Sequence, residues 1–245
     1  MAIDKIIHYC WFGNNPKSDS VLTYIEGWKR KLPEYKIIEW NESNFNINIC
    51  KYVREAYEAE KYAFVSDYAR LYALYKYGGI YLDTDVEVCK NLEPILNSEK
   101  LTFGFEELEF IATSTIVAPK FSSFINFFME SYHDRDFIKS DGNIDETTNV
   151  QVVTKMLQEI GLRKSGENQK LEFDKEEINI LEQVYFSPFD YINFENKSTP
   201  DTYTIHHFSH SWADINSIRR RKLKKYIVRY ISKRRFFFFM NYFDN

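Results

Sequence analysis

Hydrophobic and polar positions follow two different periods along the first 85 residues. Residues 5–11 and 35–40 form short apolar runs with the length of buried strands. Between them, four apolar residues share one face of a helical wheel: Val21, Leu22, Ile25 and Trp28. Ser18 or Asp19 is suited to cap this helix, and Pro33 ends it. The pattern therefore predicts a strand, a helix and a second strand.

A stronger helix is predicted over residues 63–77. Its apolar positions recur at helical spacing: Phe64, Tyr68, Leu71, Leu74 and Tyr75. Gly78 and Gly79 follow, as is common at the C-terminal end of a helix, and residues 80–82 begin another strand. Repeated strand–helix–strand units favour an α/β sheet with parallel strands.

Beyond residue 100 the periodicity is weaker but still indicates four elements. Residues 101–105 and 115–117 have strand character, and residues 121–132 and 150–160 have helical character. Segment 163–177 is polar, and we expect it to be a surface excursion. Neither an internal repeat nor a Pro- or Ser-rich linker divides the chain.

Composition excludes several classes of protein. The chain has 245 residues and 44% hydrophobic residues, enough to bury a large core, so wholesale disorder is excluded. Three cysteines far apart in sequence provide neither a disulfide framework nor a CxxC metal pair, which indicates a reducing compartment. We see no signal peptide and no apolar window of about 20 residues. Because glycine-rich phosphate loops are absent, a nucleotide would need other contacts.

Charge divides the chain into two parts. The formal net charge is −4, yet residues 215–245 hold ten basic residues and one acid, so this tail is +9 and the remainder −13. Basic charge confined to a tail is not typical of a general nucleic-acid binder, so we expect no nucleic-acid partner. We therefore expect two parts, a domain over 1–214 and a tail over 215–245.

The tail has the pattern of a basic amphipathic helix. Five apolar residues gather on one side of its helical wheel: Leu223, Tyr226, Ile227, Tyr230 and Ile231. Four consecutive phenylalanines follow at 236–239. This arrangement predicts binding to an anionic membrane surface, with a helix packed on the acidic body as the alternative. The membrane interpretation places the protein in the cytoplasm, peripheral on the inner face of the cell membrane.

An Asp-x-Asp pair is the sharpest chemical feature. Asp83 and Asp85 directly follow the strand predicted over 80–82. Ligands of open α/β sheets gather at the carboxyl ends of strands, and two carboxylates there are suitable ligands for Mg²⁺ or Mn²⁺. A turn-forming acidic pair is the alternative.

The helix before this pair carries a second polar group. Asp67 and Arg70 are three residues apart on one face, with Ser66 beside them. Arg70 is suited to bind phosphate or sugar oxygens, while Asp67 accepts hydrogen bonds from sugar hydroxyls. A surface ion pair is the alternative interpretation. Trp11, at the end of the first strand, is suited to stack on a nucleobase or to pack in the core.

Three of the five histidines lie within residues 206–210. His207 and His210 would face one metal ion if this segment were helical or tightly turned. On composition alone the metal-ligand interpretation of His207 is balanced against a packed or solvated one. For His206 the packed or solvated interpretation is favoured.

Four segments occur in an order that resembles one known family: IIHYCWFG, FVSDYARLYALYKYGGIYLDTD, FGFE and HHFSHSW. Together they resemble the DXD-containing sugar transferases of glycosyltransferase family thirty-two. Many bacterial members serve capsular or cell-surface polysaccharide assembly, and the clostridial glucosylating toxins share the core. The resemblance covers most of residues 3–212 and is densest across 60–106.

The resemblance implies a GT-A fold, a nucleotide-binding, Rossmann-like mixed sheet flanked by helices, and a nucleotide-sugar donor. It implies that Trp11 stacks on the base and that Tyr81 lines the nucleotide. Ser66, Asp67 and Arg70 match donor-binding positions, with Asp67 and Arg70 near the sugar.

The same resemblance assigns the metal and the closing loop. Asp85 is expected to bind the ion directly, while Asp83 contacts ribose, sugar or a metal-bound water. His207 falls where the loop contributes a metal ligand, and Ser211 and Trp212 match a loop that closes over the diphosphate. Position 210 is a small residue in many relatives, so whether His210 binds metal stays open.

The resemblance thus implies a metal-dependent, retaining glycosyltransferase that uses Mn²⁺ or Mg²⁺ and a UDP-sugar. The implied sugar is galactose, glucose or N-acetylglucosamine, and the implied acceptor is a saccharide or lipid-linked oligosaccharide. The candidate catalytic residues are Asp67, Arg70, Asp83 and Asp85. Two other classes are weighed against it: a metal-dependent hydrolase using the histidine cluster, and a membrane-binding module without catalysis.

Overall fold

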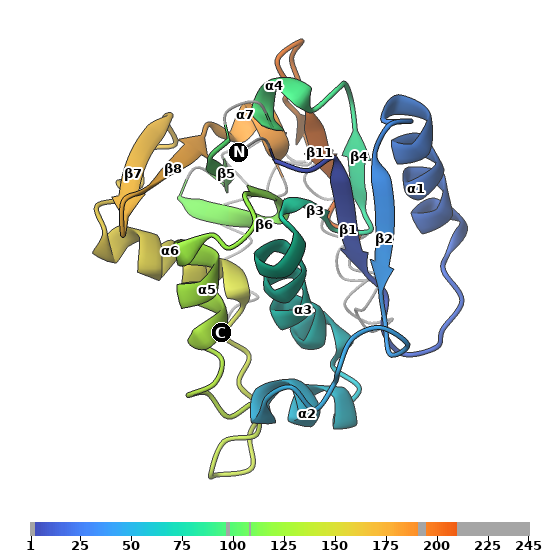
Figure 1. Ribbon diagram of the computed structural model, residues 1–245, viewed down its shortest axis with the longest axis vertical. Helices are drawn as coiled ribbons and strands as arrows, with labels where there is room; N and C mark the ends of the chain where they lie inside the picture. The colour runs from blue at the N-terminus through green and yellow to red at the C-terminus, as the bar shows by residue number, and fades with distance from the viewer. Residues whose placement is uncertain (1–2, 97–98, 108, 191–194, 210–245) are drawn as a thin grey trace, which may run out of the picture.

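A seven-stranded mixed sheet forms the centre of the molecule in the computed structural model, which describes residues 3–96, 99–107, 109–190 and 195–209 (Figure 1). Its strands, in spatial order, are β2 (Lys36–Trp40), β1 (Ile6–Cys10), β3 (Gly79–Leu82), β6 (Phe110–Ala118), β5 (Leu101–Glu106), β8 (Glu176–Leu181) and β7 (Gln169–Phe173). The pairs β1–β2, β1–β3 and β5–β8 are parallel. The other neighbours in this sheet are antiparallel.

Two small antiparallel ribbons accompany the main sheet. One pairs β4 (Val86–Val88) with β11 (Thr204–His206), and the other pairs β9 (Phe189–Asp190) with β10 (Glu195–Asn196). In the first ribbon His206 stands opposite Val86. This register brings a segment from beyond residue 200 beside the residues that follow β3.

Helices cover both faces of the main sheet (Figure 1). They are α1 (Asp19–Lys31), α2 (Lys51–Glu58), α3 (Tyr62–Tyr77), α4 (Glu93–Leu96), α5 (Ser123–Glu130), α6 (Asn149–Glu159) and α7 (Gln183–Phe186). Residues of α2, α3, α5 and α6 share one hydrophobic cluster, and residues of α1, α4 and α7 share the other. Strand side chains alternate between the two: in β1, Ile7 and Tyr9 join the second cluster and Cys10 the first.

Two helix ends show why the sequence folds in this way. Ser18 caps α1 because its side chain accepts a hydrogen bond from the Val21 N–H at 3.4 Å. Gly78, at φ +63°, ends α3, and Gly79 follows at φ +101°, backbone conformations that residues with a Cβ rarely adopt. A Cβ on Gly79 would lie 2.6 Å from the Ile6 carbonyl oxygen. The glycine pair therefore allows β3 to lie directly against β1.

Most predicted elements are confirmed, including the parallel pairing of the first three sheet strands and the expected α/β class. The expectation for 163–177 was wrong, because this segment contains β7 and the start of β8. Its charged residues face solvent at the sheet edge, which hides the strand pattern. Helix α2 was not predicted at all.

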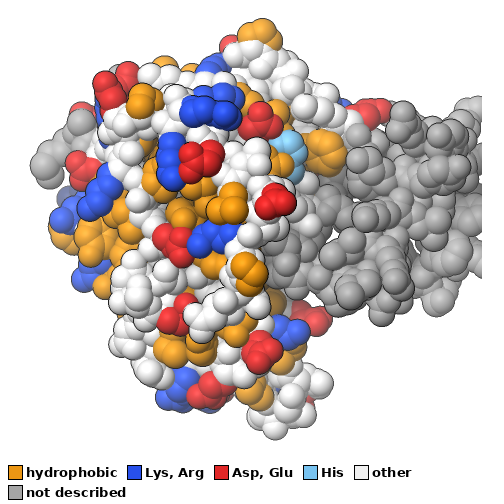
Figure 2. All heavy atoms as spheres, turned by 90° about the vertical axis from the view of Figure 1, so that its right-hand side faces the viewer, with side chains coloured by type: hydrophobic (Ala, Val, Ile, Leu, Met, Phe, Trp, Pro, Cys, Tyr) orange, Lys and Arg blue, Asp and Glu red, His pale blue; other side chains and the backbone are white. Residues whose placement is uncertain are grey.

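The tail over 215–245 and the boundary at 214 lie outside the described residues, so both stay predictions. Within the described part of the chain, no helix combines the length and apolar character needed to cross a membrane. Figure 2 shows the side of the molecule that carries α1 and β2, where acidic and basic side chains are intermixed.

Candidate functional site

Asp83 and Asp85 lie in the turn that connects β3 to β4. The Asp83 N–H donates to the Ser114 carbonyl at 2.8 Å, which ties this turn to β6. The Tyr81 hydroxyl donates to Asp83 Oδ1, also at 2.8 Å. The pair therefore has a defined position at the carboxyl end of β3, as the sequence predicted.

Residues 206–209 contact both carboxylate oxygens of Asp85. His206 Nε2 lies 3.3 Å from Oδ1, and the Ser209 N–H donates to Oδ2 at 2.6 Å. The His207 N–H also donates to the Asp85 carbonyl at 3.1 Å. Asp85 is thus the point where residues after β11 join the turn after β3.

Asp83, Asp85 and His206 form a group suited to hold a metal ion. One ligand atom from each residue lies within 4.8 Å of the other two. Two carboxylates and an imidazole are a suitable donor set for Mn²⁺, and carboxylates also suit Mg²⁺. The residues present therefore fit a divalent metal.

The structure brings His206 into this group, whereas sequence analysis had singled out His207. The His207 Nε2 lies 3.0 Å from Glu87 Oε2, and its ring stacks on Tyr24 with the centroids 5.1 Å apart. The metal-ligand role of His207 stays a prediction that this geometry does not favour. Strand alternation was the signal in the sequence that could have identified His206. Residues two apart on a strand point to the same side, and His206 is two residues after Thr204, whose hydroxyl contacts Thr115 in the sheet.

Opposite charges shift both pKa values at the Asp85–His206 contact. Burial alone would lower the pKa of His206, but the carboxylates of Asp85 and Glu106 raise it to about 10. Burial would raise the pKa of Asp85, but His206 and the Ser209 N–H hold it well below its usual value. Each of the two groups therefore favours the charged form of the other.

Asp67 and Arg70 extend the site along α3. Arg70 Nη2 donates to Asp67 Oδ1 at 2.9 Å, and Nη1 donates to the Thr113 carbonyl at 2.8 Å and lies 3.4 Å from Asp83 Oδ1. The guanidinium also lies over the Tyr81 ring, 4.6 Å from its centroid. Arg70 is only 6% exposed, so this is no surface ion pair.

The carboxyl of Asp67 is poised between its two protonation states. Its pKa is raised to about 7, chiefly by burial and against the opposing effect of Arg70. A buried acid of this kind donates or accepts hydrogen bonds according to its ligand. Ser66, by contrast, donates its hydroxyl to the Tyr62 carbonyl at 3.0 Å within α3, and its donor-binding role stays a prediction.

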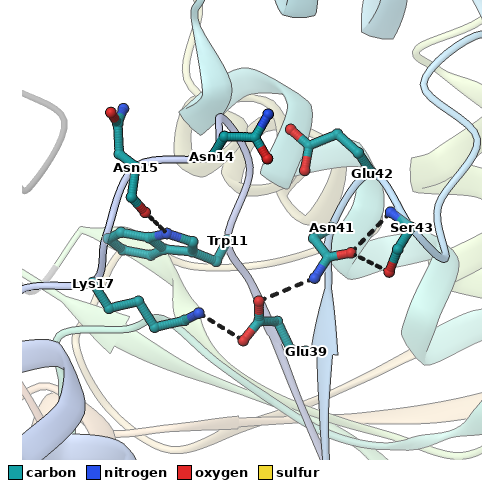
Figure 3. Close-up of a pocket in the computed structure, with 8 residues that line it drawn as sticks. All are labelled: Trp11, Asn14, Asn15, Lys17, Glu39, Asn41, Glu42 and Ser43. Carbon is teal, nitrogen blue, oxygen red and sulfur yellow. Dashed lines mark hydrogen bonds and ion pairs between the residues drawn. The ribbon is translucent and has the colours of Figure 1, made fainter.

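Trp11 lines a pocket of about 560 Å³ beyond the ends of β1 and β2 (Figure 3). Its indole N–H donates to the Asn15 carbonyl at 2.7 Å, and the Lys17 ammonium lies 5.6 Å from the ring centroid. Glu39 accepts from Lys17 and Asn41 at the bottom of the view in Figure 3. Trp11 is half-buried, and the pocket lies beside it.

Residues 210–212 lie outside the described residues. The expectations for His210, Ser211 and Trp212 stay predictions.

Residues 18–102 match the family model described as "Glycosyltransferase sugar-binding region containing DXD motif". This match spans about a third of the chain and contains Asp67, Arg70, Asp83 and Asp85. Over 108 residues the chain is 31% identical to inositol phosphoceramide mannosyltransferase 3 of Schizosaccharomyces pombe. That alignment covers 39% of this chain and 28% of the yeast relative.

Solved structures give a second comparison. The PaToxG glycosyltransferase is similar with a TM-score of 0.50 and 17% identity, over 65% of this chain and 72% of that one. The galactosyltransferase LgtC gives a TM-score of 0.45 and 10% identity, over 93% and 96% of the two chains. The likeness to PaToxG concerns the fold alone. Together with the helix-flanked mixed sheet it agrees with the expected GT-A type fold.

Proposed function

We propose that this protein is a metal-dependent glycosyltransferase that moves a sugar from a UDP-sugar to a saccharide acceptor with retention of configuration. One observation carries the proposal: Asp83, Asp85 and His206 converge at the end of β3. The two aspartates lie within the segment that matches the DXD sugar-binding region. Galactose, glucose or N-acetylglucosamine is the proposed sugar.

Asp83, Asp85 and His206 would hold the divalent ion. When bound, Mn²⁺ or Mg²⁺ supplies Lewis-acid stabilisation of the charge that develops on a leaving diphosphate. Asp85 is suited to bind the ion directly. Asp83, held by the Tyr81 hydroxyl and beside Arg70, is suited to orient either the ion or a hydroxyl of the donor.

Asp67 and Arg70 would orient the transferred sugar. Arg70 is held by Asp67 and the Thr113 carbonyl, and this buried position preorganises its charge. Asp67 is poised to accept from, or donate to, a sugar hydroxyl because its pKa is raised to about 7 by burial. We assign no nucleophile, and the default is a front-face reaction in which the leaving phosphate takes the acceptor proton.

The Trp11 pocket would hold the nucleobase. A half-buried indole offers its face for stacking, and Asn14, Asn41 and Ser43 place amide and hydroxyl groups around the same pocket. We also propose that Ser66 and Tyr81 contact the nucleotide-sugar donor.

The segment after β11 would exclude water from the site. Ser209 and His207 contact Asp85. The role of Ser211 and Trp212 in closing over the diphosphate is proposed from the sequence alone. Closure of such a segment over the diphosphate would protect the donor from hydrolysis.

The acceptor is proposed to be a lipid-linked oligosaccharide of capsular or surface polysaccharide synthesis. This part rests on the sequence of residues 215–245, whose charge and aromatic residues suit an anionic membrane surface. Peripheral attachment on the cytoplasmic face of the membrane follows as part of the same proposal.

A hydrolase that uses a separate histidine site is less favoured. His206 belongs to the aspartate group, and the His207 ring faces Glu87.

Calorimetric titration with uridine diphosphate, with and without Mn²⁺, tests the proposal. We expect binding that Mn²⁺ strengthens, because the ion would join the diphosphate to Asp83 and Asp85. Absence of binding under both conditions would overturn the proposed function. A panel of nucleotide sugars, assayed for donor hydrolysis, then identifies the base and the sugar.

A further inference from the structure

The two ring nitrogens of His206 face two different carboxylates. Nε2 lies 3.3 Å from Asp85 Oδ1, and Nδ1 lies 3.8 Å from Glu106 Oε2. Among the described residues, Nδ1 is a buried atom without a hydrogen-bond partner. The ring is also held by Phe208, whose centroid lies 3.9 Å away. His206 thus has a metal-facing side and a side that faces Glu106.

Strand alternation explains why Glu106 reaches this place. Phe103 and Phe105 of β5 point into the cluster shared with α3 and α5. Gly104 and Glu106 point to the opposite face, where a Cβ on Gly104 would lie 2.9 Å from the Phe186 ring. The Thr204 hydroxyl donates to the Phe186 carbonyl at 2.9 Å on this same face, so β11 lies there too.

We propose that Glu106 is a positioning residue for metal binding, which holds the Nδ1–H of His206 so that Nε2 points at the ion shared with Asp83 and Asp85. The proposal deepens the proposed function and rests on its metal site. Glu106 is the last residue of both the FGFE segment and β5.

The chemistry of imidazole supports this role. A metal-binding histidine coordinates through one nitrogen, and the hydrogen bond of the other nitrogen sets its tautomer and ring orientation. A carboxylate at Nδ1 selects the Nδ1–H tautomer, which leaves the Nε2 lone pair for the ion. The present 3.8 Å is an ion-pair distance, and a closer approach of about 1 Å would make it a hydrogen bond.

The burial of Glu106 supports it as well. Its side chain is only 12% exposed, and burying a carboxylate costs free energy unless a partner compensates. His206 supplies that partner at 3.8 Å. If the only role of Glu106 were to end β5, this buried position would not require a charged side chain.

The test compares two glutamates that each face one of two adjacent histidines. Glu106→Gln removes the charge beside His206, and Glu87→Gln does the same beside His207, whose Nε2 lies 3.0 Å from Glu87. Mn²⁺ affinity of the full chain is measured by calorimetry or by electron paramagnetic resonance. We expect Glu106→Gln to weaken Mn²⁺ binding by roughly tenfold or more. We expect Glu87→Gln to change it less than about twofold.

Two further measurements separate positioning from general structural damage. In a His206→Ala background, Glu106→Gln should cause no further loss of Mn²⁺ affinity, because its effect acts through the ring. Nitrogen-15 spectra of the protein loaded with Zn²⁺, a diamagnetic ion that imidazole ligates, should show His206 as the Nδ1–H tautomer in the parent and lose that preference in Glu106→Gln. If Glu106→Gln fails to fold, Glu106→Asp keeps the charge and should retain more affinity than any neutral variant that folds.

The outcomes distinguish this inference from the proposed function. If the parent protein binds neither Mn²⁺ nor uridine diphosphate, the metal site itself is wrong. If the parent binds both and Glu106→Gln binds Mn²⁺ equally well, or if its effect persists unchanged in the His206→Ala background, the positioning role is wrong and the proposed function stands.

Discussion

Individual side chains at the site compensate one another's charge. Arg70 is shared by Asp67 and Asp83, and His206 by Asp85 and Glu106. Each cation lies between two acids, so the buried carboxylates do not repel one another unopposed. Removal of one member should therefore affect both the proposed metal site and the orientation of its neighbours.

Asp85→Ala should remove most of the dependence of uridine diphosphate binding on Mn²⁺ and reduce sugar transfer by roughly 10²–10³-fold, because charge stabilisation on the leaving diphosphate is lost. Calorimetry and a transfer assay measure the two effects. Asp201→Ala is the control, since Asp201 is exposed. Full activity of Asp85→Ala would contradict the assigned metal site.

At the scale of elements, one buried histidine of β1 joins the end of β2 to the end of α3. His8 Nε2 donates to the Gly78 carbonyl at 2.8 Å, and Nδ1 accepts from the Trp40 indole at 3.1 Å. Both nitrogens are used by the neutral ring, which fits a side chain with no exposure. Burial lowers the pKa of His8 to about 4, against a hydrogen-bond effect of the Gly78 carbonyl that raises it.

This shift predicts a specific pH dependence of folding. Between pH 6.5 and 4 the unfolded chain binds a proton at His8 that the folded chain does not, so stability falls as pH is lowered. From pH 7 to pH 5 the loss from this residue should be about 2 kcal/mol. Urea unfolding at both values measures it. His8→Gln should show a smaller difference between the two pH values, whatever its absolute stability.

The junction of α3 and β3 gives a second prediction. Gly79→Ala should lower the free energy of unfolding by about 1–3 kcal/mol, because a Cβ meets the Ile6 carbonyl at φ +101°. Gly27→Ala is a matched control. No atom lies within 4 Å of its added Cβ, and alanine favours a helix by up to about 1 kcal/mol. Denaturant unfolding of both variants should give opposite signs, and a neutral Gly79→Ala would contradict the close packing.

At the scale of the whole molecule, the main sheet gathers the site from segments far apart in sequence. The turn after β3 supplies two acids, α3 supplies Asp67 and Arg70, and the register of β4 with β11 adds His206. The likeness to the PaToxG glycosyltransferase also belongs to this scale, because it concerns the arrangement of elements.

The sequence of the tail, residues 215–245, predicts that the whole chain binds anionic membranes, which the candidate site does not require. Removing residues 215–245 should release the protein from anionic vesicles, because ten basic residues are lost, each worth about 1 kcal/mol near anionic lipid. Co-sedimentation with vesicles that contain or lack anionic lipid measures this. Unchanged binding of the shortened chain would contradict the membrane proposal, while uridine diphosphate binding should be retained.

The sequence by itself determined much of the first half of the chain. Apolar periodicity located α1, α3 and the strands around them, and the Asp-x-Asp pair after β3 supplied two residues of the candidate site. These features depend on residues close together in the chain, so apolar periodicity and helix caps can be recognised from the sequence. Edge strand β7 was missed, since its charged residues face solvent.

Only the tertiary structure decided which histidine joins the site. The family resemblance placed His207 at the metal, but adjacent residues on a strand point to opposite sides, and the pairing of β11 with β4 turns His206 toward Asp85. Glu106 enters the same group because β5 and β11 meet from about 100 residues apart in the chain. Such long-range register depends on how whole elements pack, which local patterns do not encode.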